Sequence, residues 1–227
     1  MNMLPRLPWE NNTHDLPIAQ HIAARTAQAI VEQTQPPGSF LTEVELASTF
    51  QASRTPAREA MLQLERWGLV QLMPKKGAHV TTLSVAEITD LSAVRTMFEI
   101  DAVTHFSAAP HTDPTLSADL HTLLDQQRTF LKTRDALSFA ATDYAFHARL
   151  IYSGKNTIVM QLLANLGPRL ARLTHHAAIT NPHLMDKYFT EHEQLAACAQ
   201  TADVEAFAAL TRQHIYEAHF PRESSIR

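Results

Sequence analysis

The sequence predicts a mainly α-helical protein in two parts. The first is an N-terminal winged helix-turn-helix with a small β-hairpin wing, and the second is a C-terminal all-α helical bundle. Apolar residues recur at three- and four-residue spacing over most of the 227 residues. In the stretch 69–83, apolar and polar residues instead alternate, as in a pair of strands. We expect a flexible arm over 1–15, the winged-helix domain over 16–84 and the helical domain over 85–227.

The composition is typical of a globular protein from a reducing compartment. The chain is 45% apolar, and its one cysteine, Cys198, excludes an internal disulfide. The start of the chain lacks the basic-then-apolar pattern of a signal peptide, and no apolar run is long enough to cross a bilayer. We therefore expect a cytoplasmic protein that does not contact a membrane.

Charge is distributed unevenly along the chain. The formal net charge of −4 argues against a strongly basic nucleic-acid binder. Residues 50–82, however, hold five basic and two acidic side chains, which gives this segment a net charge of +3. A basic segment in an acidic chain indicates an anionic partner for that segment alone.

The N-terminal part begins with two predicted helices. The apolar spacing predicts a helix over 18–33, and the Pro-Pro-Gly stretch at 36–38 ends it because proline cannot continue a helix. Thr42 and Glu45 fit a capping box, which opens a second, shorter helix over 43–50.

A third helix and a hairpin complete this part. Ser53 is the expected N-cap, Pro56 lies in the first turn, and the helix runs to Trp67 before Gly68 ends it. Segments 69–74 and 78–83 then alternate as two strands joined by a short basic turn. This order of helices and strands describes a winged helix-turn-helix.

The second part reads as helix throughout, because proline, glycine and a "TADVE" turn separate long stretches of helical spacing. We expect six helices, at about 85–109, 114–132, 135–154, 156–178, 182–199 and 203–218.

The third helix has the features of a recognition helix. Arg54 and Arg58 are four residues apart, so they share one face near the helix start, which is the part that enters a major groove. Arginine can read guanine or clamp phosphate, and short hydroxyls suit phosphates. Expected DNA contacts are Ser53, Arg54, Thr55, Pro56 and Arg58 on the helix and Lys75, Lys76 and Gly77 on the wing; Leu62, Leu64, Trp67 and Leu69 are expected to form its buried side.

The stretch "PPGSFLTEVELASTFQASRTPAREAMLQLERWGLVQLMPKKGAHVTTLS" strongly resembles the DNA-binding domain of the GntR family of bacterial regulators. That resemblance implies that Arg54 and Arg58 are the principal readers of bases and phosphates. One departure is Val44, where some members of the family carry an arginine. The resemblance therefore implies one DNA contact fewer and a different operator preference.

Four residues of the second part form a candidate metal site. Asp143 and His147 lie at i and i+4 on one helix face, and His192 and His214 are equally far from the turn at Asp203. Two antiparallel helices joined at that turn would bring the two histidines to one level. Such a set suits Zn²⁺, Ni²⁺, Mn²⁺ or Fe²⁺. With 13 histidines in the chain, spacing alone leaves a chance grouping open.

The second part resembles the all-helical FCD effector domain of the FadR subfamily, in its shorter six-helix form. The stretches "LSAVRTMFE", "DYAFHARLIYSGKN", "EHEQLAACAQTADVEAF" and "RQHI" carry the resemblance. It implies that Asp143, His147, His192 and His214 bind a divalent metal, which helps to hold a small organic acid or sugar acid. Candidate partners of the effector carboxylate are Arg95 first, then Arg149 and Arg172, and structural salt bridges are the alternative for each.

These observations predict a ligand-responsive transcription regulator and not an enzyme. We expect a repressor, because repression is the commoner behaviour in the family that the chain resembles. It would bind double-stranded operator DNA as a homodimer, because each winged helix reads one half-site. The alternative is a metal-dependent hydrolase or lyase that uses the same Asp/His site, although this would leave the winged helix unexplained. A third possibility is a metal that only stabilises the bundle.

Overall fold

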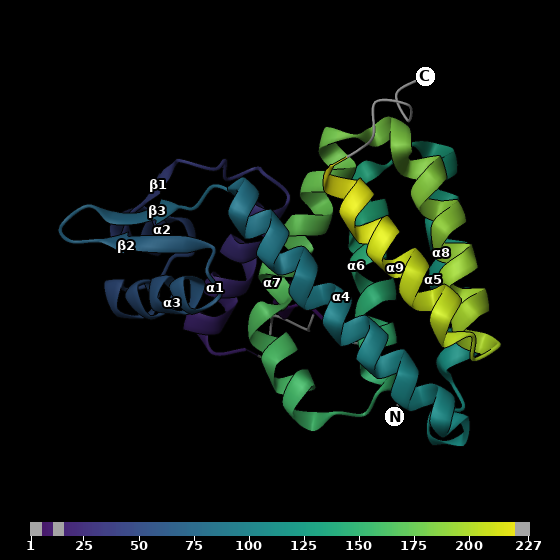
Figure 1. The fold of residues 1–227 in the computed structure, drawn as a ribbon. Helices are drawn as coiled ribbons and strands as arrows, with labels where there is room; N and C mark the ends of the chain where they lie inside the picture. Colours follow the sequence, from purple (N-terminus) through teal and green to yellow (C-terminus); the bar gives the residue numbers. More distant parts are fainter. Residues whose placement is uncertain (1–5, 11–15, 221–227) are drawn as a thin grey trace. The chain divides into compact units, whose positions relative to one another are not determined.

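The computed structural model describes residues 6–10 and 16–220 and divides into two compact units. The head unit comprises Arg6–Ser84 together with Leu163–Arg172, a segment of a helix from the second half of the chain. The bundle unit comprises Val85–Leu162 and the chain from Leu173 onward. Figure 1 gives the labels of the helices and strands of both units.

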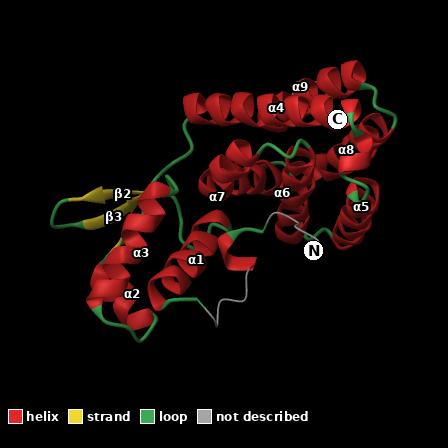
Figure 2. Ribbon diagram, turned by 90° about the horizontal axis from the view of Figure 1, so that it is seen from below, coloured by secondary structure: helices red, strands yellow, loops and turns green. Residues whose placement is uncertain are grey.

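The head unit contains three helices and a small sheet. The helices are α1 (Ile18–Val31), α2 (Glu43–Thr49) and α3 (Arg54–Arg66). The strands β1 (Phe40–Leu41), β2 (Val70–Met73) and β3 (Gly77–Val80) form an antiparallel sheet in the order β1-β3-β2. Figure 2 shows α1, α2 and α3 gathered beside the β2–β3 hairpin.

Local sequence determines how α2 and α3 begin. The predicted capping box of α2 is present: the Glu45 backbone amide donates to the Thr42 hydroxyl at 3.2 Å, and the Glu45 carboxylate accepts from the Thr42 amide at 3.0 Å. Ser53 occupies the N-cap position of α3 in an extended conformation. The short connection from the end of α2 at Thr49 to Ser53 places α3 directly against α2.

The head core is built from one face of each helix and the inner face of the sheet. Ile22 and Ile30 of α1, Leu64 of α3 and Val80 of β3 are fully buried within it. The prediction was wrong for Leu62, whose side chain is 39% exposed. The buried stripe of α3 follows helical spacing through Ala57, Ala60, Met61 and Leu64, so position 62 falls outside it.

Strand β1 was not predicted. It has two residues, and its partners lie almost 40 residues further along the chain, so it has no local signal; Phe40 pairs with His79 and Leu41 with Ala78. The pairing explains Gly77, whose φ is +98° and where a Cβ atom would collide with the Leu41 carbonyl oxygen.

The expected arm lies partly outside the described residues, at 1–5 and 11–15. Within the described part, Pro8–Glu10 forms a short 3₁₀ turn that contacts α1. Leu7 is 1% exposed, so this piece of the arm contributes to the head unit.

The six predicted helices of the second part are present among the described residues. They are α4 (Val85–Ala108), α5 (Leu116–Thr133), α6 (Ala136–Ser153), α7 (Thr157–Thr180), α8 (Met185–Gln200) and α9 (Val204–His219). Two 3₁₀ turns, Pro110–Thr112 and Pro182–Leu184, precede α5 and α8.

In the bundle unit, α6 is covered by α4 and α5, while α8 and α9 close the other side. Figures 1 and 2 both show α4 and α9 lying side by side. Phe139, Phe146, Leu150 and Phe207 are fully buried in the core. Within residues 6–10 and 16–220, no helix combines the length and the apolar character needed to cross a membrane.

Candidate functional site

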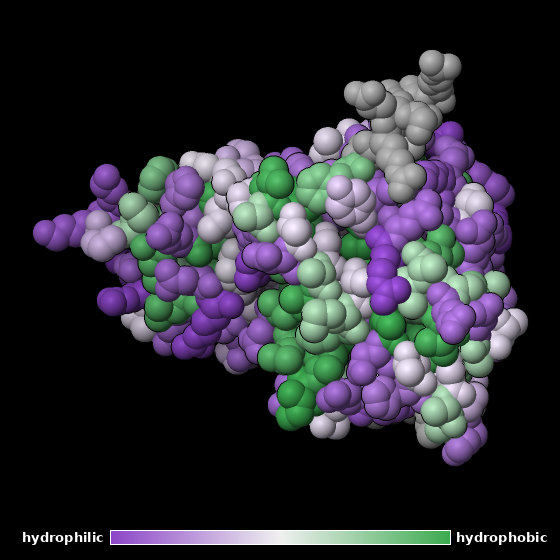
Figure 3. Space-filling model, in the orientation of Figure 1, coloured by the Kyte–Doolittle hydropathy of each residue, from purple (hydrophilic) through white to green (hydrophobic). Residues whose placement is uncertain are grey.

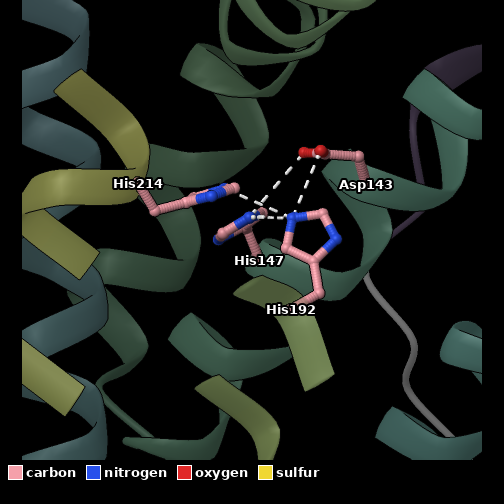
Figure 4. A group of neighbouring side chains, drawn as sticks. All are labelled: Asp143, His147, His192 and His214. Atoms are coloured by element: carbon pink, nitrogen blue, oxygen red, sulfur yellow. Dashed lines mark hydrogen bonds and ion pairs between the residues drawn. The ribbon is translucent and has the colours of Figure 1, made fainter. Parts of the chain in front are cut away.

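The four predicted metal ligands converge in the bundle core. Asp143 and His147 extend from α6, His192 from α8 and His214 from α9, and Figure 4 shows their side chains directed toward one another. One ligand atom from each lies within 4.8 Å of the others, and all four residues are buried. The antiparallel arrangement predicted around Asp203 therefore brings His192 and His214 to one level.

The separations of these atoms fit a common cation. His192 Nε2 lies 3.1 Å from His147 Nε2, 3.2 Å from His214 Nε2 and 3.3 Å from Asp143 Oδ2. Ligands about 2.1 Å from one metal at angles of 90–109° lie about 3.0–3.4 Å apart. These three separations fit ligands around one ion, whereas Asp143 Oδ1 lies further away, 3.7 Å from His147 Nε2.

Each histidine is held by a second side chain on its other ring nitrogen. His147 Nδ1 lies 2.8 Å from Glu99, His214 Nδ1 lies 2.7 Å from Glu191, and His192 Nδ1 lies 2.9 Å from the side-chain oxygen of Gln127. Because these oxygens accept hydrogen bonds, they favour the tautomer with the proton on Nδ1. Three Nε2 lone pairs then face one another, an arrangement that a cation stabilises.

Burial sets the protonation states in the site. It lowers the pKa of His147 and of His192 well below the usual value, and nearby positive charge adds to the effect, so both rings are neutral at pH 7. Burial raises the pKa of Asp143 and of Glu99, while the charge of Arg95 opposes that rise. Neutral imidazoles are the form that binds metals.

Arg95 lies beside the four ligands. Its guanidinium donates to Glu99 at 3.0 Å, to Thr174 at 3.3 Å and to Asp143 at 3.4 Å. The residue is 5% exposed. Glu99 thus accepts from both Arg95 and His147, which links the guanidinium to a metal-ligand candidate through one carboxylate.

A small cavity adjoins the site, with a volume of about 10 Å³, which is room for about one water molecule. Its lining combines polar side chains with small apolar ones: Arg95, Asp143, Thr174, Ala177, Ala178, Tyr188, His214, Ile215, Ala218 and His219. Of the three arginines predicted to meet an effector, Arg95 is in this lining.

The other two arginines hydrogen-bond protein groups within their own units. Arg149 donates two hydrogen bonds of 2.8 Å to Asp113 and one of 2.8 Å to Asp119, in a buried charge cluster of the bundle unit. Arg172, in the head unit, donates to the Thr81 hydroxyl at 2.8 Å and to the Thr81 carbonyl oxygen. Neither arginine is among the residues that line the cavity.

Several site residues gave no usable signal in the sequence. Glu99 and Gln127 come from α4 and α5, at no fixed spacing from the histidines that they contact. Tyr188 lies one turn before His192, and its hydroxyl donates to the Ala218 carbonyl at 3.3 Å. His219 lines the cavity, but nothing in the local sequence marks it as part of a cavity wall.

The predicted DNA-contacting side chains lie at the surface of the head unit. Ser53, Arg54, Thr55, Arg58, Lys75 and Lys76 are exposed, and Pro56 and Gly77 are partly exposed. Arg58 Nε lies 4.0 Å from Glu43, and both side chains face solvent. This exposed pair contributes little stability, so Arg58 remains available to a stronger anionic partner.

A groove of about 490 Å³ runs between α3, the start of α2 and the wing. Arg58, Lys75 and Lys76 line it, together with apolar residues such as Met61 and Leu72. Figure 3 shows hydrophobic surface between the wing and α3 with hydrophilic residues around it. Arg58 of the helix and both lysines of the wing thus face one groove, which Glu43 also lines.

Two family models match the chain. The model of the FCD domain matches residues 90–217, and the model described as bacterial regulatory proteins, gntR family, matches residues 18–80. Together they extend over the helix-turn-helix, the wing and all four metal-ligand candidates.

Known proteins of similar sequence or fold include transcription regulators. The HTH-type transcriptional repressor RspR of Escherichia coli K12 is 27% identical over 203 residues, which cover 88% of this chain and 87% of RspR. The crystal structure of a putative transcriptional regulator GntR from Rhodococcus sp. RHA1 has a TM-score of 0.77 at 22% identity, covering 88% of this chain and 94% of that one. E. coli McbR/YncC has a TM-score of 0.75 at 18% identity, with coverages of 89% and 95%.

Proposed function

We propose that this chain, which belongs to the gntR family of bacterial regulatory proteins and carries an FCD domain, is a repressor controlled by a small carboxylate. Proteins with this combination of domains are transcription regulators and not enzymes. In this proposal the winged helix binds operator DNA, and the bundle binds a divalent metal together with the carboxylate.

One observation carries the effector part of the proposal: a buried guanidinium beside a converging Asp/His set. Arg95 and the four ligand candidates lie in the core of the same unit, next to a cavity that both Arg95 and Asp143 line. A buried arginine next to open metal positions suits a carboxylate, which can meet both at once. Because the cavity holds only about one water, effector binding must move the side chains that line it.

Asp143, His147, His192 and His214 would hold the metal. Once bound, a divalent ion supplies positive charge and coordination positions for a carboxylate oxygen. The mixed nitrogen and oxygen set suits Zn²⁺, Ni²⁺, Mn²⁺ or Fe²⁺. Glu99, Gln127 and Glu191 keep the three imidazoles oriented through Nδ1.

The DNA surface comprises the start of α3 and the tip of the wing. We assign base and phosphate contacts to Arg54 and Arg58, with Ser53, Thr55 and Pro56 beside them, and phosphate contacts to Lys75, Lys76 and Gly77 of the wing. A homodimer would place two heads on a pseudo-palindromic operator. Effector control requires that the carboxylate bind the DNA-competent and DNA-incompetent states with unequal affinity.

A gel-retardation assay with the DNA upstream of the gene tests the DNA part. The Arg54→Ala/Arg58→Ala double variant should lose retardation, whereas Arg66→Ala, an exposed arginine at the other end of α3, should retain it. Retardation by the double variant equal to that by the parent protein would contradict the assigned surface.

A thermal-shift screen tests the effector part. Small carboxylates and sugar acids are added to the full chain, with the candidate metals present or after chelation. We expect at least one acid to raise the melting temperature only when metal is present, because a ligand that binds the folded state stabilises it. Stabilisation that is independent of metal would contradict the shared site.

A further inference from the structure

His219 is a cavity residue to which the proposed function gives no role. It lies at the end of α9, five residues after His214, and both histidines line the small cavity. A helix rises about 1.5 Å per residue, so the two positions are about 7.5 Å apart along α9. His219 therefore lines the cavity at a distance from the metal ligands, where the remainder of a bound acid would lie.

His219 is partly exposed as a residue, but its Nδ1 atom is buried and has no hydrogen-bond partner among the described residues. A buried polar atom without a partner destabilises the folded state, so this atom is suited to receive a hydrogen bond from a bound molecule. Here the atom belongs to a ring that faces a cavity next to the proposed effector site.

The charge of the ring limits which ligand group it can receive. Burial lowers the pKa of His219 to about 3, and Arg95 adds to the effect, so the ring is neutral at pH 7. Burial raises the pKa of Tyr188, so its hydroxyl is also uncharged. Within the lining, Arg95 is the one arginine or lysine.

These observations favour an effector that carries one carboxylate and one neutral polar group. A second carboxylate would meet no counter-charge at His219, and burying an unpaired charge is strongly unfavourable. A hydroxyl both donates and accepts hydrogen bonds, so it can pair with Nδ1 in either tautomer. The alanines at 177, 178 and 218 and Ile215 would contact the hydrocarbon part of the ligand.

We propose that His219 hydrogen-bonds a hydroxyl group of the effector, and that the effector is a small hydroxylated monocarboxylate. This inference rests on the proposed function, because it assumes that a carboxylate binds at Arg95 and the metal. It adds a specificity-determining residue and a chemical class to that site.

Four-carbon acids of equal length test the inference, with the metal-loaded full chain in a titration calorimeter. The probes are butanoate, its 2-, 3- and 4-hydroxy derivatives, and succinate, which carries a second carboxylate instead of a hydroxyl. We expect one hydroxy acid to bind about ten-fold more tightly than butanoate, as one hydrogen bond allows, and succinate to bind no better than butanoate.

The variants separate the role of His219 from a general loss of structure. His219→Phe should bind butanoate as the parent does and lose the preference for the hydroxy acid, while metal content and gel retardation stay unchanged. His219→Asn, whose amide nitrogen can replace Nδ1, should restore part of the preference. His121→Phe, at an exposed position of α5, is the matched control and should behave as the parent.

Two other outcomes overturn the inference in different ways. If hydroxy acid and butanoate bind the parent equally, or if His219→Phe keeps the preference, the role of His219 is wrong while the carboxylate site stands. If none of the acids binds with metal present, both the carboxylate site and the inference fail.

Discussion

The four metal-ligand candidates show how much one residue in this site depends on its neighbours. His214 has Glu191 on one ring nitrogen and His192 on the other, and all three are buried. Removing the imidazole deletes one of four ligands and leaves the Glu191 carboxylate without its hydrogen bond from His214. The loss should therefore appear first in metal affinity.

We expect His214→Ala to lose bound metal while the helical content is kept. Replacing a side chain that only hydrogen-bonds a metal ligand typically lowers metal affinity about 10–100-fold. Removal of a ligand itself should therefore lower the affinity by more than this. Elemental analysis after gel filtration measures the metal, and circular dichroism measures the helix. His121→Ala, at an exposed position, is the control. Full metal content in His214→Ala would refute the four-ligand site.

His219 should also affect how stability depends on pH. Its pKa is about 3 in the folded protein and about 6.5 when unfolded. The unfolded chain therefore binds a proton between these values, and stability falls as pH decreases below 6.5. Between about pH 7.5 and about pH 5.5, this group alone should reduce the free energy of unfolding by up to about 1.4 kcal/mol.

Chemical denaturation at the two pH values checks this prediction. The loss of stability on acidification should be smaller in His219→Phe than in the parent, because phenylalanine does not titrate. Glu99 and Asp143 have raised pKa values and act in the opposite direction, but they are present in both proteins. Equal pH dependence in the two proteins would mean that His219 is not buried as described.

At this scale the sequence could predict which side chains come close together wherever helical spacing carries the information. The i, i+4 pair Asp143 and His147 needed only one correct helix, and His192 and His214 needed only two helices and a turn. Arg149 and Glu99 could not be resolved in this way, because their partners come from other elements. An arginine that binds an effector and one that forms a structural ion pair look the same in sequence.

At the scale of elements, close approach between two helices fixes one glycine of the bundle. A Cβ atom on Gly154 would lie 2.7 Å from the Cα atom of Ala102 and 2.9 Å from its Cβ atom. Gly154 caps α6 with an ordinary helical φ of −71°, so its backbone conformation alone does not require glycine. The requirement comes from the packing of α6 on α4.

We expect Gly154→Ala to destabilise the protein by about 1–3 kcal/mol, the usual range for overpacking. Gly38→Ala is an informative comparison, because a Cβ atom there would have no atom within 4 Å, but the φ of Gly38 is +82°. That variant should lose only about 1–2 kcal/mol through backbone strain. Thermal unfolding measures both, and an unchanged melting temperature for Gly154→Ala would contradict the α4–α6 contact.

The elements that sequence predicted are those whose signals are local. The six bundle helices follow from apolar spacing and from proline, glycine and cap positions, and α2 follows from its capping box. Strand β1 depends on pairing with β3 across almost 40 residues, and its two residues show no alternation. Leu62 was misassigned because the buried stripe of α3 is narrow.

At the scale of the whole molecule, the distribution of charge determines how the regulator meets DNA. The chain has a formal net charge of −4, so long-range attraction to a phosphate backbone must come from the basic face of the head. Operator affinity should consequently depend on a few lysine and arginine side chains of the head unit. Their number can be derived from how steeply the affinity falls with salt concentration.

The logarithm of operator affinity should fall linearly with the logarithm of salt concentration, with a slope of about −0.9 for each phosphate neutralised. Lys75→Ala/Lys76→Ala should make this slope shallower by up to about 3.6 if a dimer places two wings on one operator, and by about half as much if one wing binds. Fluorescence anisotropy over a salt series measures the slope.

Because the wing lysines contact phosphates in this scheme, affinity for operator and for unrelated DNA should fall together. Arg54→Ala should instead reduce operator preference, and a parent slope near zero would contradict the assigned DNA surface.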